Sequence, residues 1–393
     1  MGERVKVAEV FELQMGKTPA RDRLEYWNNG DHEWVSIKDL GAYDKYVGRT
    51  KETISELGRM ESGIKSVPAG TLIMSFKLSL GKAAITTKET YTNEAIMAFL
   101  DKKSFEINLN YMWHQFRSKD WGRETNAAVK GKTLNKKSLG SVEIVVPSIG
   151  AQLGVAAKLD RLLEQIEFAR QEERLLDSLV KSQFVEMFGD PIANPREWPV
   201  STIKETAVAY GDGPFGSNLK SSDYVEDGVR VIRLGNILQG AFSEKDRSFV
   251  SFEKYEKLKK YECKPGEVVI ATLGDPILRA CLVPDFGAPS IHKADCMYYE
   301  TDKAKVLPAF AMNVINQPAM LQRATEDAHG QTRIRINSTQ TGNLPIIVPP
   351  IELQNEFCRF VAEVDKSRFV ARKSAELIMN MQALDIRLNA RLQ

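Results

Sequence analysis

Ile144-Val-Val-Pro-Ser-Ile-Gly-Ala-Gln152 returns as Ile346-Ile-Val-Pro-Pro-Ile-Glu-Leu-Gln354, about 200 residues further along the chain. Each copy opens a long segment with helical spacing, and each follows a segment of short strand patterns. Repetition over such a distance is typical of a duplicated structural unit. The sequence therefore predicts a chain built twice, with a globular domain and a long helix in each half.

The strand patterns that precede the two copies also correspond to one another. In the first half, Trp34–Leu40, Thr71–Ser75 and Lys82–Thr86 have strand character and are bounded by turn residues. In the second half, the corresponding strand patterns are Val229–Gly235, Lys264–Ala271 and Arg279–Leu282. Short strands with helices between them indicate a compact α+β domain in each half.

The two long segments have apolar residues at alternating steps of three and four, which is typical of a coiled-coil seam. The predicted helix–helix seam comprises Leu159, Leu162, Ile166, Ala169, Leu176 and Val180, with Glu173 as a polar member, and Leu353, Phe357, Phe360, Val364, Ser367, Ala371, Ser374, Ile378 and Met381. Because neither helix is apolar all round, each needs a partner. We expect the two to pair antiparallel about a pseudo-twofold axis. The alternative is that each packs only on its own domain.

The expected fold is thus α+β, with two pseudo-twofold-related globular domains separated by two long antiparallel helices that form a coiled coil. The predicted boundaries are 1–146 for the first domain, 147–190 for the first helix, 191–348 for the second domain and 349–393 for the second helix. Pro147 precedes the first helix, and Gly189-Asp-Pro191 ends it.

Composition excludes several classes of protein. The 393 residues carry a net charge of only +2 and are 43% hydrophobic, so any nucleic-acid contact must come from local basic clusters. No apolar run reaches about 18 residues, so no membrane span is expected. No apolar leader follows Met1, and the four cysteines form no C-x-x-C pair. We therefore expect a cytoplasmic protein with free thiols and no metal site.

Catalytic motifs fail when their geometry is considered. Gly16-Lys-Thr18 and Gly131-Lys-Thr133 lack the glycine five residues earlier that a phosphate-binding loop requires, since Phe11 and Asn126 occupy those positions. The segment Val348-Pro-Pro-Ile351 has neither the polar acceptor nor the aromatic ring of an adenine-methyltransferase tetrapeptide. We therefore expect no catalysis in this chain.

Several pieces of the sequence, taken in order, resemble the specificity subunits of type I restriction–modification enzymes over nearly the full length. These pieces are Gly16-Lys-Thr-Pro-Ala-Arg21, Trp34-Val-Ser-Ile-Lys-Asp-Leu40, Ser75-Phe-Lys-Leu-Ser-Leu-Gly-Lys82, Phe184-Val-Glu-Met-Phe-Gly-Asp-Pro191 and Asp212-Gly-Pro-Phe-Gly-Ser-Asn-Leu-Lys220. One difference between the halves matters: Thr272-Leu-Gly-Asp-Pro276 stands where the first half has Phe76-Lys-Leu-Ser-Leu-Gly81. The two domains are therefore expected to contact DNA differently.

The resemblance implies that each domain is a target recognition domain for one half of a split DNA site. It also implies that the helices serve as spacer and as docking surface for two methyltransferase (modification) subunits. Those partners bind S-adenosylmethionine and methylate adenine; motor-nuclease (restriction) subunits can join them, and this chain itself holds no cofactor. The candidate DNA contacts are Lys17, Thr18, Arg21, Lys38, Lys77, Ser79, Lys82, Lys130 and Lys132 in the first half, and Ser217, Asn218, Lys220, Arg230, Arg233, Asn236, Arg279, Gln331, Arg333, Arg335 and Asn337 in the second.

Two other functions stay open on the residues alone. A helical adaptor would bind proteins through the same domains and helices, and its binding to DNA would not fall steeply with salt. A self-contained modification enzyme would transfer methyl groups from S-adenosylmethionine without a partner. Solvated surface is the ordinary role of each basic residue named above.

Overall fold

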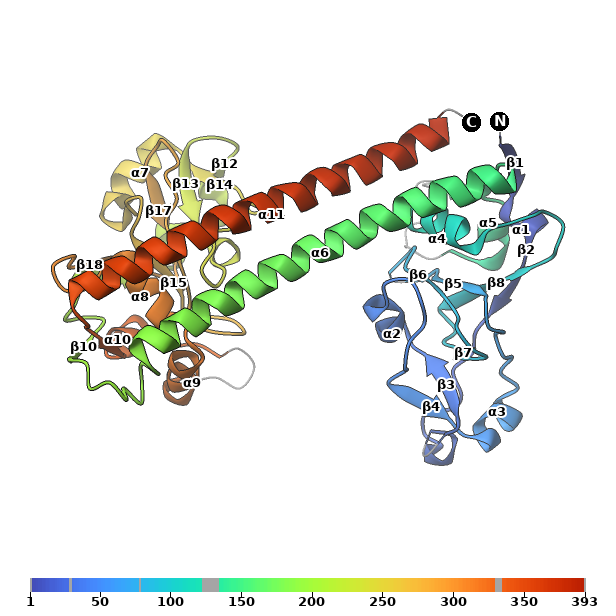
Figure 1. The fold of residues 1–393 in the computed structure, drawn as a ribbon, viewed down its shortest axis with the longest axis horizontal. Coiled ribbons are helices and arrows are strands. Elements are labelled where there is room, and N and C mark those ends of the chain that lie inside the picture. Colours follow the sequence, from blue (N-terminus) through green and yellow to red (C-terminus); the bar gives the residue numbers. More distant parts are fainter. Residues whose placement is uncertain (1, 28–29, 78, 122–133, 329–333, 392–393) are drawn as a thin grey trace. The chain divides into compact units, whose positions relative to one another are not determined.

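The computed structural model describes residues 2–27, 30–77, 79–121, 134–328 and 334–391. The chain divides into two compact units, Met1–Arg170 with Arg372–Gln393 and Gln171–Ala371. Each unit contains several short strands, short helices and part of two long helices, which Figure 1 draws in green and red. The predicted α+β class is confirmed.

The first unit is built around an antiparallel sheet of order β2-β8-β5-β6 and a smaller sheet of order β4-β3-β7. A separate antiparallel pair, β1 and β9, joins the start of the domain to its end. The strands of this domain are β1 (Glu3–Lys6), β2 (Phe11–Met15), β3 (His32–Val35), β4 (Glu52–Ile54), β5 (Leu72–Ser75), β6 (Ala83–Ile85), β7 (Tyr91–Thr92), β8 (Ile96–Asp101) and β9 (Glu143–Val146), and its helices are α1 (Val7–Val10), α2 (Ile37–Ala42), α3 (Glu56–Ser62), α4 (Leu109–Ser118) and α5 (Lys136–Gly140).

The second unit repeats this plan. Its main sheet has the order β11-β18-β15-β16, its smaller sheet the order β12-β14-β13-β17, and its joining pair is β10 with β19. The elements of this domain are β10 (Val200–Thr202), β11 (Ala207–Asp212), β12 (Tyr224–Val225), β13 (Val229–Ile232), β14 (Ser248–Val250), β15 (Val268–Ala271), β16 (Arg279–Leu282), β17 (Ser290–His292), β18 (Cys296–Thr301), β19 (Pro345–Ile347), α7 (Phe252–Leu258), α8 (Pro308–Ile315), α9 (Pro318–Asp327) and α10 (Ser338–Gly342).

The two units also correspond in the direction of strand pairing and in their helix caps. The one parallel pairing within each small sheet joins β3 to β7 in the first unit and β13 to β17 in the second. The small helices before the last strand match as well, since Asn135 and Asn337 each cap one by accepting a hydrogen bond from a backbone amide three residues later. The sequence repeat is thus a repeat of a whole folded domain.

The two long helices are α6 (Ile149–Phe188) and α11 (Ile351–Arg391). Each begins after the repeated Pro-containing segment, because a proline fits the chain just before a helix. At its far end α6 stops at Gly189, which has a left-handed φ of 77° and donates its amide to Val185 O at 2.9 Å.

A buried glutamine fixes each helix to the domain before it. Gln152 and Gln354 are fully buried. The Gln152 Oε1 accepts from Asn108 N at 2.7 Å, and its Nε2 donates to Glu106 O and Pro147 O at 2.9 and 2.8 Å. Gln354 repeats the arrangement with Leu307 N, Lys305 O and Pro349 O, each at 2.9 Å. At each junction these bonds satisfy one backbone amide and two backbone carbonyls, so they tie the first turn of the helix to its domain.

Apolar packing completes each junction. In the first unit Ala156 belongs to the domain core, and the half-buried Val155 and Leu163 pack against it. In the second unit the end of α6 and the start of α11 both enter the core through Phe184, Phe188 and Phe357. The Phe184–Phe357 and Phe188–Phe357 ring centroids lie 5.5 and 5.6 Å apart, in edge-to-face geometry.

Within the second unit the two helices run antiparallel. Asp177, earlier in α6 than the phenylalanines, pairs with Arg368, later in α11, at 2.8 Å. Arg368 is well covered, with a side chain only 13% exposed. Of the predicted seam, Leu159, Leu162, Ile166, Val180, Phe357, Val364 and Ala371 are buried, Ala169, Leu176 and Ile378 are half-buried, and the side chain of Met381 lies outside the described residues.

The seam of α11 differs from its prediction at every second position. Val361 is buried, whereas Phe360 packs at the edge of the same core. Ser367 and Ser374 are exposed. The inward position next to Ser367 belongs instead to Arg368. An arginine was not expected in a helix seam, but its pairing with Asp177 compensates its charge where it is covered.

We expect Gln354→Ala to lower the free energy of unfolding by about 3 kcal/mol, because it leaves one buried amide and two buried carbonyls without partners. Urea unfolding of the full chain measures this, with Gln171→Ala, an exposed position on α6, as the control. An equal and small effect of both substitutions would contradict the role assigned to the buried glutamine.

Candidate nucleic-acid interface

In the first unit, the loop after β2 is held tightly against the small sheet. Gly16 N donates to Ile96 O at 3.1 Å and Lys17 N to Thr92 O at 2.9 Å. A Cβ at Gly16 would lie 2.2 Å from Thr92 O, so only glycine permits this approach. Trp34 Nε1 also donates to Lys17 O at 3.1 Å, and this hydrogen bond holds the loop against β3.

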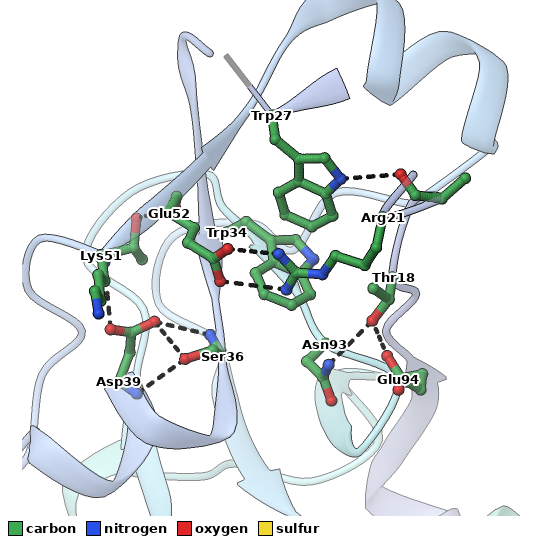
Figure 2. Close-up of polar contacts among 12 residues, drawn as sticks. Thr18, Arg21, Trp27, Trp34, Ser36, Asp39, Lys51, Glu52, Asn93 and Glu94 are labelled. Carbon is green, nitrogen blue, oxygen red and sulfur yellow. Dashed lines mark hydrogen bonds and ion pairs between the residues drawn. The ribbon is translucent and has the colours of Figure 1, made fainter. Parts of the chain in front are cut away.

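The loop places Arg21 beside Trp27 and Trp34, as Figure 2 shows. Its guanidinium carbon lies 3.8 Å from the Trp27 ring centroid and 4.9 Å from that of Trp34. Both terminal nitrogens donate to the two carboxylate oxygens of Glu52, one of them at 3.2 Å. Trp27 Nε1 donates to Ala20 O at 3.0 Å, so the upper ring is also fixed. Arg21 therefore has a defined plane and a defined direction.

The polar groups beside Arg21 are already paired. The Thr18 hydroxyl donates to Glu94 and accepts from Asn93 Nδ2 at 3.0 Å (Figure 2). Asp39 accepts from the amide and hydroxyl of Ser36 at 3.0 and 2.7 Å, which caps α2. Thr18 thus supports the loop, and only a rearrangement of these hydrogen bonds would free its hydroxyl for a ligand.

The remaining predicted contacts of the first unit are on its surface. Lys17, Lys38 and Lys82 are exposed, and Lys77 and Ser79 are half-buried in the loop after β5. Lys17 donates to Ser62 O. Lys77 Nζ lies 5.3 Å from the Phe76 ring centroid, close enough for a cation–π contact. Lys130 and Lys132 lie outside the described residues.

In the second unit, a different set of side chains stands on the small sheet and the loops beside it. Arg233 pairs with Asp246 at 3.0 Å, and its guanidinium carbon lies 5.7 Å from the Tyr224 ring centroid. Lys293 Nζ lies 5.4 Å from the same ring. Two cations thus lie near one aromatic ring, and Asp246 pairs with one of them.

A second group lies around Arg335, which was predicted as a DNA contact. Its guanidinium pairs with Asp295 at 2.8 Å, and its central carbon lies 5.7 Å from the Phe215 ring centroid. Phe215 is exposed, and the exposed Ser217, Asn218 and Lys220 follow it in the loop after β11. Gln331 and Arg333 lie outside the described residues.

Four of the predicted contacts in the second unit have structural roles instead. Asn236 is fully buried, accepts from Arg233 N at 2.9 Å and donates to Ser243 O and Asp246 O. Arg230 is 5% exposed and donates to Asp246 O at 2.7 Å. Arg279 donates to Ile237 O at 3.2 Å and to Pro276 O, and Asn337 caps α10. Burial removes Asn236 and Arg230 from the groups that can reach DNA.

Sequence reasoning missed Glu52, Lys293 and Asp246. Glu52 could have been found only by pairing β3 with β4, which places it opposite Trp34. Lys293 follows β17, whose parallel pairing with β13 brings it beside Tyr224. Strand pairing brings Glu52 and Lys293 to their places in the site, and the local sequence pattern does not predict these pairings.

Two buried histidines carry lowered pKa values. Burial lowers the pKa of His292 to about 4, and its Nδ1 lies 3.0 Å from Tyr261 O and 3.2 Å from Cys263 Sγ. Burial also lowers the pKa of His114, and this outweighs its 2.7 Å hydrogen bond with Asp160. Burial alone would raise the pKa of Asp160, but the hydrogen bonds from Lys45 and His114 lower it overall. These groups join elements within each unit, and both histidines are buried.

Metal chemistry and membrane insertion find no support among the described residues. No group of three or more histidine, cysteine or acidic side chains in those ranges could hold a metal ion. Within the same ranges, no helix combines the length and apolar character that crossing a membrane requires.

Comparison with known proteins shows which family and which proteins this chain resembles. Residues 3–177 match the family described as type I restriction modification DNA specificity domain. The chain is 25% identical over 238 residues to the MjaIX type I restriction enzyme specificity subunit of Methanocaldococcus jannaschii, covering 60% of this chain and 51% of that subunit. It is 26% identical over 165 residues to the EcoR124I/EcoR124II specificity subunit of Escherichia coli, covering 39% of each. The matches thus span about half or less of these two subunits.

A longer match links the chain to the MjaVIII specificity subunit of M. jannaschii, with 21% identity over 96% of this chain and 89% of that subunit. Among solved structures, the type I S subunit from M. genitalium aligns over 98% of this chain and 95% of its own, with a TM-score of 0.50 and 12% identity. A chain from a type I restriction–modification assembly aligns with a TM-score of 0.57 and 14% identity over 98% and 97%. Residues 3–177 thus match the type I specificity domain, and the chain as a whole is similar to type I restriction–modification specificity subunits.

The lowered pKa of His292 predicts a loss of stability in acid. The unfolded chain takes up a proton below pH 6.5, but the folded chain does so only near pH 4. Stability present at neutral pH is therefore lost as the pH falls from 6.5 to 4, by about 3 kcal/mol. Chemical unfolding of wild type and His292→Asn across this range measures the loss. Parallel pH curves for the two proteins would contradict it.

Proposed function

We propose that this chain is a non-catalytic, sequence-specific DNA-binding subunit that recognises a bipartite, asymmetric site. Each unit would read one half-site. The chain would direct methyltransferase subunits, which bind S-adenosylmethionine and methylate adenine, to that site. Motor-nuclease subunits would join the same complex where restriction accompanies modification.

The observation that supports two different half-sites is the contrast between a repeated scaffold and unlike surfaces. The main sheet has the same strand order in both units, and the small sheet differs by one additional strand, β12, in the second unit. At the small sheet, however, the first unit presents Arg21 beside Trp27 and Trp34, and the second presents Arg233 and Lys293 near Tyr224. Because base edges are read by the direction and type of side-chain donors, different side chains on one scaffold select different sequences.

The long helices support the role of a spacer. Each is a continuous helix of 40 or 41 residues. Each is also fixed to the preceding domain by a buried glutamine, which limits the freedom of the domain on its helix. Domains held in this way would address half-sites about one turn of DNA apart, roughly 34 Å.

DNA binding is expected to weaken steeply with salt, because lysine and arginine contacts to phosphate release counterions. The full chain, co-purified with its methyltransferase subunits, would be titrated with duplex DNA between low and moderate salt. Six phosphate contacts would give a slope of about −5 in a plot of log affinity against log salt concentration. A slope near zero would favour a protein-binding adaptor, and methyl transfer by the chain alone would favour a self-contained enzyme.

Lengthening both helices is expected to change the spacer and leave both half-sites unchanged. One inserted heptad adds about 10 Å at 1.5 Å per residue, or about three base pairs. The insertions would follow Glu172 in α6 and Val370 in α11, and methylation-aware sequencing would report the new motif. Altered half-sites with an unaltered spacer would rule out the spacer role, and exchange of one heptad for another of equal length is the control.

A further inference from the structure

The Arg21 guanidinium has a defined orientation on the surface of the first unit. It is stacked 3.8 Å from Trp27 and 4.9 Å from Trp34, whose rings meet edge to face at 5.0 Å. Trp34 is fully buried in the domain, so the lower ring cannot move without disturbing the core. Figure 2 shows the guanidinium beside these rings with its fork toward Glu52.

The two carboxylate oxygens of Glu52 form a planar pair of acceptors for that fork. Glu52 lies opposite Trp34 in the antiparallel pairing of β3 and β4, so both side chains project from the same face. Its side chain is 39% exposed and that of Arg21 is 50% exposed. An ion pair this open to solvent contributes little free energy, so a ligand with two acceptors in one plane can displace the carboxylate at small cost.

Guanine presents such a pair of acceptors, O6 and N7, in the major groove. Phosphate also accepts two hydrogen bonds from an arginine fork, so the charge around Arg21 has to distinguish the two ligands. The surroundings of Arg21 are unfavourable for phosphate. Glu52 contacts it directly, and Glu94 accepts from the neighbouring Thr18. Negative charge repels a phosphate more strongly than it repels a neutral base edge.

Arg23 provides an internal comparison two residues away. It also lies over an aromatic ring, with its guanidinium carbon 4.3 Å from the Tyr26 centroid. Two carboxylates hold it, Glu25 at 2.7 Å from Nε and Glu61 at Nη1. Its donors are divided between these two carboxylates and the Tyr26 hydroxyl, and releasing it would require all three to leave. Arg23 therefore has a structural role, whereas Arg21 has one replaceable partner.

We propose that Arg21 is a specificity-determining residue that reads a guanine of the half-site bound by the first unit, and that Glu52 occupies the place of the guanine edge in the free protein. This inference rests on the proposed function and makes it specific at one position. Trp27 and Trp34 act as positioning residues, because they fix the plane of the guanidinium. On binding, the carboxylate of Glu52 gives up the fork and guanine O6 and N7 accept it.

The test is selection from a random duplex library by the full chain with its co-purified methyltransferase subunits. Wild type is expected to enrich a split motif with a guanine in one half. Arg21→Lys keeps the charge but removes the fork, so preference at that one position should fall by about tenfold or more, with the other half-site unchanged. Arg23→Lys, the matched control, should retain the wild-type motif.

Two further measurements separate base reading from phosphate binding. Replacing the guanine by 7-deazaguanine removes N7, so binding by wild type should weaken about tenfold while binding by Arg21→Lys changes little. Glu52→Gln removes the competing carboxylate, and it should bind the wild-type motif several-fold more tightly with the guanine preference retained. These effects are expected at one base pair only.

The outcomes distinguish this inference from the proposed function. If wild type enriches no split motif, the proposed function fails and the assignment of Arg21 fails with it. If wild type enriches a motif that Arg21→Lys leaves unchanged, the assignment of Arg21 alone is wrong. A uniform weakening of all sequences by Arg21→Ala, with full binding by Arg21→Lys, would make Arg21 a phosphate contact and would also overturn it.

Discussion

The structure depends on one buried side chain that the sequence repeats. Gln152 and Gln354 each accept one backbone hydrogen bond and donate two, all from a fully buried position. Each joins the first turn of a long helix to the segment that leads into α4 or α8. A buried amide of this kind is costly unless every bond is made, so the junction tolerates little variation in geometry. The glutamine consequently limits movement between the domain and the first turn of its helix.

This constraint separates what is shared between the two units from what differs. The strand orders, the small parallel pairing, the asparagine caps and the glutamine junctions recur in both. The cores differ in how they receive the helices, with Phe184, Phe188 and Phe357 packed together only in the second unit. The surfaces differ more, because the loops after β2 and β11 carry different side chains on similar main sheets. A repeated frame with unlike surface side chains is consistent with the proposed reading of two different half-sites.

The sequence predicted the duplication, the α+β class and both long helices because these depend on local periodicity and on a motif that appears twice. It placed Phe360 and Ser367 in the helix seam, although Val361 and Arg368 face inward there, since the burial of an arginine depends on Asp177 in another helix. Asn236 and Arg230 were expected at the surface because polar residues usually lie there. Their burial depends on backbone carbonyls brought close by folding. Glu52 was missed because only strand pairing places it beside Arg21.

We infer that one chain carries two different DNA-binding domains of the same fold and brings a separate adenine methyltransferase to DNA. Methylation-aware sequencing of cellular DNA, with and without the gene for this chain, tests that claim most directly. The account predicts a split, asymmetric motif with a fixed unread gap and modified adenine on both strands, which disappears when the chain is absent. A continuous palindromic motif, or adenine methylation unaffected by loss of the chain, would contradict it.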